Sequence, residues 1–132
     1  MCTFCNEHSE TIQHLFWSCQ IVKTFWDRLG EAISNKCQHA NRMVFKEKLV
    51  LFGLDEFMYT DSVCDLIILM AKLYIYKCKV QNITLNLQNF LKELYFRFCL
   101  EKIIIKDQMT FNNKWGPYDK LFKSLLWTIK KK

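Results

Sequence analysis

The sequence predicts a mainly α-helical fold, in which a small N-terminal head precedes a helical bundle. The chain has 132 residues, 51% of them hydrophobic and 15% aromatic, so it can bury a substantial core. It contains 3 glycines and 1 proline, and so few turn-forming residues argue against a sandwich or barrel of many short strands. Apolar residues recur at intervals of three and four along most of the chain, which is typical of one helical face.

The first helix is expected from Ile21 to Ile33, and Gly30 could end it or only weaken it. Residues 35–42 lose the apolar period and are expected to form a polar loop. The next segment, residues 43–54, fits either a short strand or the last turns of a helix. The apolar run of residues 49–52 before Gly53 is compatible with either a strand or a helix end.

A long helix is expected to begin behind Asp61 or Ser62, since either side chain can cap a helix N-terminus. Another helix is expected from Thr84 or Asn86. Residues 114–117 then interrupt the pattern, because glycine is permissive and proline lacks a backbone N–H. A final amphipathic segment follows this interruption.

We expect an intracellular protein, located in the nucleus and/or the cytoplasm and not secreted. No secretory pattern follows Met1. The most apolar run, from Val63 to Tyr76, is interrupted by Asp65 and Lys72 and is shorter than the roughly 20 residues that span a bilayer. Disulfides are rare in reducing compartments, and 7 unevenly spaced cysteines fit no disulfide framework. We therefore expect reduced cysteines and no membrane partner.

Four residues of the head have the types and spacing of zinc ligands: Cys2, Cys5, His14 and Cys19, in the pattern C-x2-C-x8-H-x4-C. Four such ligands fill the tetrahedral corners around zinc, which makes the site structural, because catalytic zinc keeps one position open. His8 is the alternative histidine, but it lies at the expected exposed tip of the loop. The other interpretations are ordinary reduced cysteines, or a redox pair, which needs C-x-x-C after a strand in a βαβ unit. The remaining cysteines are expected to be small hydrophobic residues of the core: Cys37, Cys64, Cys78 and Cys99.

These patterns divide the chain into a zinc-clamped head, residues 1–30, and a helical tail, residues 31–132. We expect the tail to pack on the head as one compact unit. The predicted cofactor is a single structural zinc ion.

The head also resembles a known family. Residues 2–5 (CTFC), residues 10–19 (ETIQHLFWSC) and the following Phe25-Trp26 are similar to the zinc-binding domain of reverse transcriptases. That domain lies near the C-terminus of the polyproteins of LINE-type (non-LTR) retrotransposons. Residues 51–54, 71–78 and 115–117 extend the similarity more weakly. The resemblance implies that the chain corresponds to the region downstream of the polymerase. It also implies partners: RNA or DNA, and the reverse transcriptase domains of a longer polyprotein.

The leading hypothesis for function is a zinc-stabilised nucleic-acid-binding module. The formal net charge of +6 suits a polyanionic partner. Lys23 and Arg28 follow the last ligand at short range and are candidate phosphate contacts, although a solvated helix face is the usual role of such residues. Trp17 could stack on unpaired bases, or it could pack beneath the metal.

No catalytic activity is expected. A polymerase needs paired carboxylates for two metal ions, and the one adjacent acidic pair, Asp55-Glu56, follows a glycine in a predicted turn. The alternative hypothesis is a structural or protein-interaction domain that docks on the polymerase or self-associates. The large aromatic content (11 Phe, 4 Trp and 5 Tyr) favours this alternative. Phosphate-dominated binding weakens steeply with salt, which separates the two hypotheses.

Overall fold

The computed structural model describes residues 1–36, 45–52 and 62–123, and within these ranges the chain forms helices and no strand. The elements follow in the order η1 (His14–Ser18), α1 (Gln20–Lys36), α2 (Glu47–Phe52), α3 (Ser62–Gln81), α4 (Leu87–Ile104), α5 (Gln108–Trp115) and η2 (Gly116–Tyr118). The predicted fold class, a small cysteine- and histidine-bearing head followed by a helical bundle, is confirmed.

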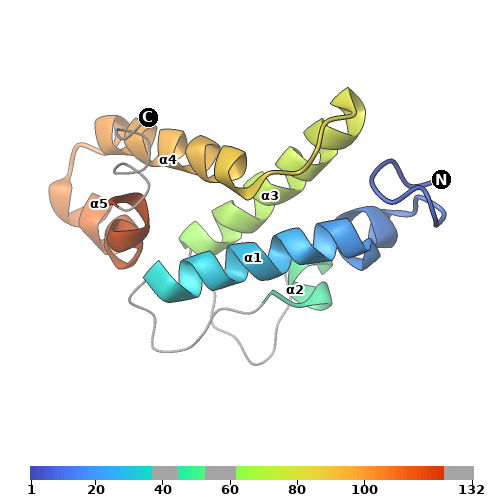
Figure 1. Ribbon diagram of the computed structural model, residues 1–132. Coiled ribbons are helices and arrows are strands. Elements are labelled where there is room, and N and C mark those ends of the chain that lie inside the picture. Colours follow the sequence, from blue (N-terminus) through green and yellow to red (C-terminus); the bar gives the residue numbers. More distant parts are fainter. Residues whose placement is uncertain (37–44, 53–61, 124–132) are drawn as a thin grey trace.

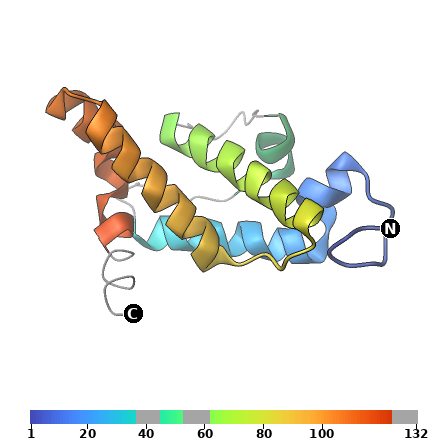
Figure 2. The ribbon, with the colours of Figure 1, turned by 90° about the horizontal axis from the view of Figure 1, so that it is seen from above.

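The part of the chain before α1, residues 1–19, which we call the head from here on, lies at one end of the described structure and α5 at the other, with α1, α3 and α4 between them (Figures 1 and 2). Helix α1 packs against η1 at one end and also contacts α4. Helix α2 contacts η1, and α5 packs against both α3 and α4. The head is therefore supported directly by α1 and α2.

The N-terminal helix is longer than the sequence predicts. Helix α1 runs through Gly30 to Lys36, so the expected boundary between residues 30 and 31 falls inside a continuous helix. The first two residues of the predicted loop, 35–42, are helical, and the others lie outside the described residues. Within the ambiguous segment 43–54, Glu47–Phe52 is helical.

Capping residues set the ends of the two long helices. Helix α3 begins at Ser62, directly behind Asp61, the first of the two predicted caps, which itself lies outside the described residues. Its last residue is Gln81, and the next residue, Asn82, has a left-handed φ of 54°. The N–H of Ile83 donates to the carbonyl of Cys78 at 2.9 Å. This is the Schellman arrangement, in which asparagine tolerates the left-handed conformation. Helix α4 begins after Asn86, whose side chain accepts a hydrogen bond from the backbone N–H three residues on.

A further helix, α5, has no counterpart in the sequence-based prediction. Asp107 caps it by accepting hydrogen bonds from the N–H of Met109 at 3.2 Å and from the hydroxyl of Thr110 at 2.7 Å. The expected interruption near residues 114–117 is present, because α5 ends at Trp115 and a short 3-10 turn follows. The last part of the predicted amphipathic segment, from residue 124, lies outside the described residues.

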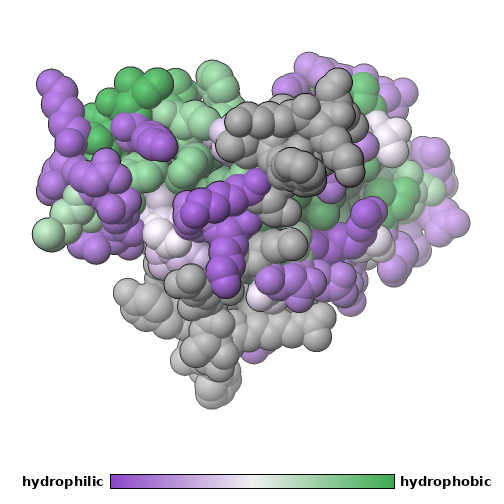
Figure 3. Space-filling view, turned by 60° about the vertical axis from the view of Figure 1, so that its left-hand side comes forward, coloured by the Kyte–Doolittle hydropathy of each residue, from purple (hydrophilic) through white to green (hydrophobic). Residues whose placement is uncertain are grey.

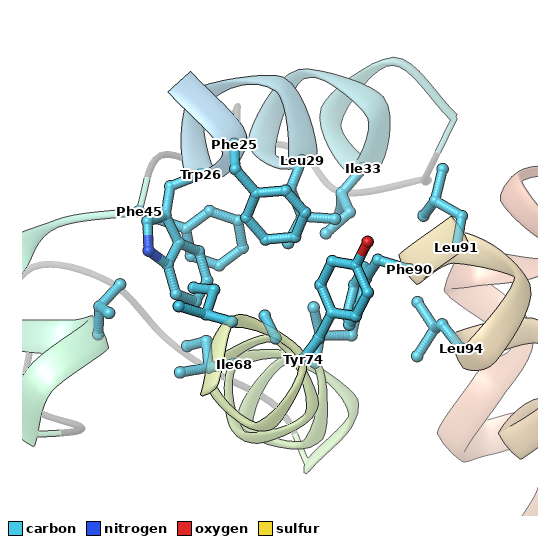
Figure 4. Close-up of a cluster of buried hydrophobic side chains, with 14 of the residues drawn as sticks. Phe25, Trp26, Leu29, Ile33, Phe45, Ile68, Tyr74, Phe90, Leu91 and Leu94 are labelled. Carbon is cyan, nitrogen blue, oxygen red and sulfur yellow. The ribbon is translucent and has the colours of Figure 1, made fainter. Parts of the chain in front are cut away.

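The core is continuous from the head into the bundle. Phe25, Tyr74 and Phe90 come from α1, α3 and α4, and their ring centroids are 5.7–5.8 Å apart (Figure 4). The buried indole N–H of Trp26 donates to the carbonyl of Phe16, beside the metal-ligand loop, at 2.8 Å. The cysteines predicted to belong to the core are buried (Cys64, Cys78) or half-buried (Cys99), and Cys37 lies outside the described residues.

Candidate metal centre

A tight turn brings the first two cysteines together. Asn6, just after Cys5, has a φ of 58°, and its N–H donates to the carbonyl of Cys2 at 2.9 Å. Asparagine is one of the few residues that adopts this left-handed conformation at small cost. The N–H of Cys2 donates to the carbonyl of His8 at 2.7 Å, which closes the loop.

The second pair of residues lies at the two ends of a π-helical turn. The N–H of Cys19 donates to the carbonyl of His14, five residues earlier, at 2.9 Å. The start of this segment is fixed by Thr11, whose hydroxyl accepts the N–H of His14 at 3.0 Å. Single π turns are often found at functional sites, since the wider turn redirects side chains. Here it places both ligands toward the turn at residues 2–5.

The four side chains form one compact cluster. The ligand atoms of Cys2, Cys5, His14 and Cys19 all lie within 4.8 Å of one another. The sulfur atoms of Cys2 and Cys19 are 3.9 Å apart, and Sγ of Cys5 lies 3.4 Å from Nε2 of His14. Tetrahedral ligands about 2.0–2.3 Å from an ion are about 3.3–3.8 Å apart. These two distances therefore fit a four-coordinate ion.

Burial and charge also suit a cation. Cys2 and Cys19 are fully buried, and His14 is 9% exposed. Hydrogen bonding to the backbone N–H of Glu7, reinforced by His14, lowers the pKa of Cys5 to about 6. Burial raises the pKa of Cys19 to about 11, so this thiol keeps its proton until a cation favours the thiolate. The cluster can hold a metal ion, and its histidine is His14 rather than the exposed His8.

A carboxylate outside the ligand set ties the metal-ligand turn to the bundle. Glu10 accepts hydrogen bonds from the N–H and hydroxyl of Thr3, at 2.7 and 2.9 Å. Its other oxygen lies 2.9 Å from Nζ of Lys79 near the end of α3. The lysine, together with the Thr3 donors, lowers the pKa of Glu10 to about 2. The two residues lie 69 positions apart, and no sequence pattern pairs them.

The three candidate nucleic-acid residues do not form one site. Trp17 is half-buried against the core, and Nζ of Lys23 lies 6.0 Å from its ring centroid. Arg28 is exposed, but five helical residues turn it about 140° around α1 from Lys23. It lines a groove formed with Leu85 and Leu87, between α1 and the start of α4. Trp17 and Lys23 are thus neighbours, and Arg28 belongs to another part of the surface.

The fold and the cluster define an α-helical protein with a candidate metal centre of three cysteines and one histidine at its N-terminal end. No family model matches the chain, and no significant match is found among curated proteins or solved structures. In the described part of the chain, no helix has both the length and the hydropathy that a bilayer span requires.

Proposed function

We propose that this protein is a zinc-stabilised nucleic-acid-binding module. The observation that carries the proposal is the complete set of four ligands next to Trp17 and Lys23, which offer an aromatic ring and a cation at the surface of the head. Zinc favours a four-coordinate site of thiolates and imidazole. With all four positions filled by the protein, its role would be structural.

Zinc would join two separate segments of the head. Cys2 and Cys5 belong to the turn at residues 2–5, whereas His14 and Cys19 belong to the π-helical segment in front of α1. When bound, the ion would hold the turn against this segment. Lys23, whose N–H donates to the carbonyl of Cys19 at 2.8 Å, would then be held at a fixed distance from the head.

The proposed ligand is single-stranded RNA or DNA. Lys23 is exposed and can neutralise a phosphate, while Trp17 is half-buried beside it and would stack on an unpaired base. Arg28 would contact the nucleic-acid backbone only if the strand continued farther along α1. The overall charge of +6 adds a non-specific attraction.

The resemblance of residues 2–29 to the zinc-binding domain of LINE-type reverse transcriptases supports the same class of function. On this proposal the protein binds template or target nucleic acid inside the cell, alongside the polymerase domains of a longer polyprotein, and itself catalyses no reaction. The identity of the metal as zinc, the polymerase domains as partners and the location inside the cell all belong to this proposal.

Titration of the zinc-loaded chain with single-stranded RNA and DNA at two salt concentrations tests the proposal. Lys23→Ala and Arg28→Ala should weaken binding to all sequences alike and each lower the salt slope by about one. Trp17→Ala should cost about 1–3 kcal/mol of single-strand affinity with metal content intact. The matched control is Lys120→Ala, an exposed lysine at the α5 end, which should change nothing. Absence of salt-sensitive binding by the parent chain would contradict the proposal.

A further inference from the structure

Helix α3 is apolar on its solvent side as well as on its core side. Leu69, Leu73, Tyr76 and Val80 are between 53% and 62% exposed. Their spacing of four, three and four residues is that of the a and d positions along a coiled-coil seam. A helix that is apolar all round is normally covered on every side. The exposed stripe of α3 therefore has the pattern of a surface that packs against another helix.

Helix α4 continues this apolar surface. Phe96 is 64% exposed and Ile103 is 78% exposed, and with Leu100 they share one side of the helix. Half-buried Met70 of α3 meets Phe96 and Leu100 in an open groove of about 470 Å³. Leu69, at the start of the α3 stripe, lines a different groove with Leu49 and Phe52 of α2. We call Leu73, Tyr76 and Val80 of the stripe, the groove at Met70 and Ile103 together the α3–α4 face. Figure 3 shows hydrophobic surface beside hydrophilic side chains on the side where α4 and α5 lie.

The charged residues that line the groove are mainly basic. Lys92 and Arg97 are exposed at its edge, and neither forms an ion pair with another residue in the described ranges. The one acidic residue in the lining, Glu93, is paired with Lys77 of α3 at 3.2 Å. The face thus combines an apolar centre with two cations that pair with no acidic residue of the described ranges.

We propose that the α3–α4 face binds an acidic amphipathic helix of another polypeptide. A groove between two helices accepts a third helix, whose apolar anchors recur at three- and four-residue spacing. Carboxylates flanking those anchors would meet Lys92 and Arg97. A second copy of this chain is disfavoured, since it carries the same cations and a net charge of +6. The proposal is independent of the metal centre and of nucleic-acid binding.

The test uses the zinc-loaded full chain and a synthetic peptide of about three heptads, with leucine at a and d and glutamate at the flanking positions. The comparison peptide replaces every glutamate with lysine. Binding is followed by fluorescence anisotropy of the labelled peptide. Leu73→Gln and Phe96→Gln remove apolar anchors, and Lys92→Glu with Arg97→Glu reverses the rim charge. Circular dichroism and metal content confirm that each variant is folded.

The matched control is Met109→Gln, because Met109 is 70% exposed on α5, outside the α3–α4 face. We expect the acidic peptide to bind and each anchor variant to weaken binding about tenfold. The double variant Lys92→Glu with Arg97→Glu should also weaken binding of the acidic peptide. The lysine peptide should bind at least about tenfold less tightly than the acidic one. Met109→Gln should leave binding unchanged. No binding of the acidic peptide, or equal binding of the two peptides, would overturn the proposal.

Three further outcomes would also overturn it, each by identifying a different occupant. One is a dimer, seen by analytical ultracentrifugation, that Phe96→Gln dissociates. Another is binding to phosphatidylserine vesicles that depends on Leu73 and Phe96 while the acidic peptide does not bind. The last is loss of RNA affinity in the same two variants, again without peptide binding.

Discussion

Cys19 is a fully buried member of the candidate ligand set, with its sulfur 3.9 Å from that of Cys2. We expect Cys19→Ser to abolish metal binding and to unfold residues 2–20, while α3, α4 and α5 remain folded. Structural zinc in finger-like peptides contributes about 10–16 kcal/mol of apparent binding, most of which is folding energy. Metal analysis together with amide NMR spectra measures both effects.

The control for this variant is Cys99→Ser, because Cys99 is half-buried on α4 and remote in sequence from the ligand set. It should leave the metal content unchanged. Retention of a full equivalent of metal by Cys19→Ser would mean that this residue is not a ligand.

Glu10 acts on the metal centre indirectly, by fixing Thr3 between the two cysteines of the turn. Glu10→Gln removes the carboxylate that Thr3 and Lys79 contact. Hydrogen bonds to a charged group contribute about 1.5–3 kcal/mol, so we expect zinc affinity to fall about tenfold or more. Competition with a chelator at pH 7 measures this loss. Glu93→Gln, which removes a more exposed ion pair, should leave the affinity unchanged.

The chelator competition is done at pH 7 because the pKa of Glu10 is lowered in the folded chain. Because folding lowers the pKa of Glu10 to about 2, its contribution is fully present above its ordinary value of about 4.5 and declines as the pH falls toward 2. Thiolate protonation releases zinc under acid conditions. If Glu10→Gln lowers zinc affinity tenfold at pH 7 in the parent chain, but has no effect in a chain whose Lys79 is already replaced, the ion pair is the source of the loss.

At the residue scale, the metal cluster could be predicted because its four ligands lie within 18 residues and their types restrict the chemistry. Glu10 could not be assigned a role from the sequence, because its partner Lys79 lies near the end of α3 and only the folded chain brings the two together. The sequence alone could have predicted that Lys23 and Arg28 lie on different parts of the surface. Their five-residue spacing places them on different sides of a helix.

At the scale of elements, the turn between α3 and α4 depends on one buried tyrosine. The hydroxyl of Tyr74 accepts the N–H of Asn86 at 3.0 Å and donates to its carbonyl at 3.1 Å, and burial raises the pKa of Tyr74 to about 12. We expect Tyr74→Phe to lower the free energy of unfolding by about 1–2 kcal/mol. Urea denaturation measures this change.

Tyr76→Phe is the control on the same helix, since Tyr76 is 53% exposed. Its effect should stay within about 0.5 kcal/mol. Equal stability of the Tyr74 and Tyr76 variants would show that the hydroxyl of Tyr74 does not stabilise the turn.

Long, periodic helices were predictable, and short ones were not. Apolar period and capping side chains located α3 and α4 to within a residue or two at their starts. Helix α2 is short, with six residues, and its apolar run is equally compatible with a strand. Helix α5 depends on Asp107 as its cap, a signal too common to predict a helix without its packing against α3 and α4.

At the scale of the whole molecule, the head and the bundle share one core. Buried residues extend from Cys2 and Leu15 in the head, through Trp26 of α1, to Trp115 of α5. Helix α1 links the two parts because it continues past Gly30. The apolar period from Ile21 to Ile33 already predicts a helix across Gly30, although glycine can also end a helix, so the sequence alone left both outcomes open. Metal binding in the head should therefore also stabilise the start of α1.

X-ray absorption spectroscopy of the protein refolded with zinc, combined with metal analysis, tests the central claim most directly. We predict one zinc per chain with three sulfur ligands at about 2.3 Å and one nitrogen ligand at about 2.0–2.1 Å. A chain that retains no zinc, or a spectrum with fewer than three sulfur ligands, would contradict the account.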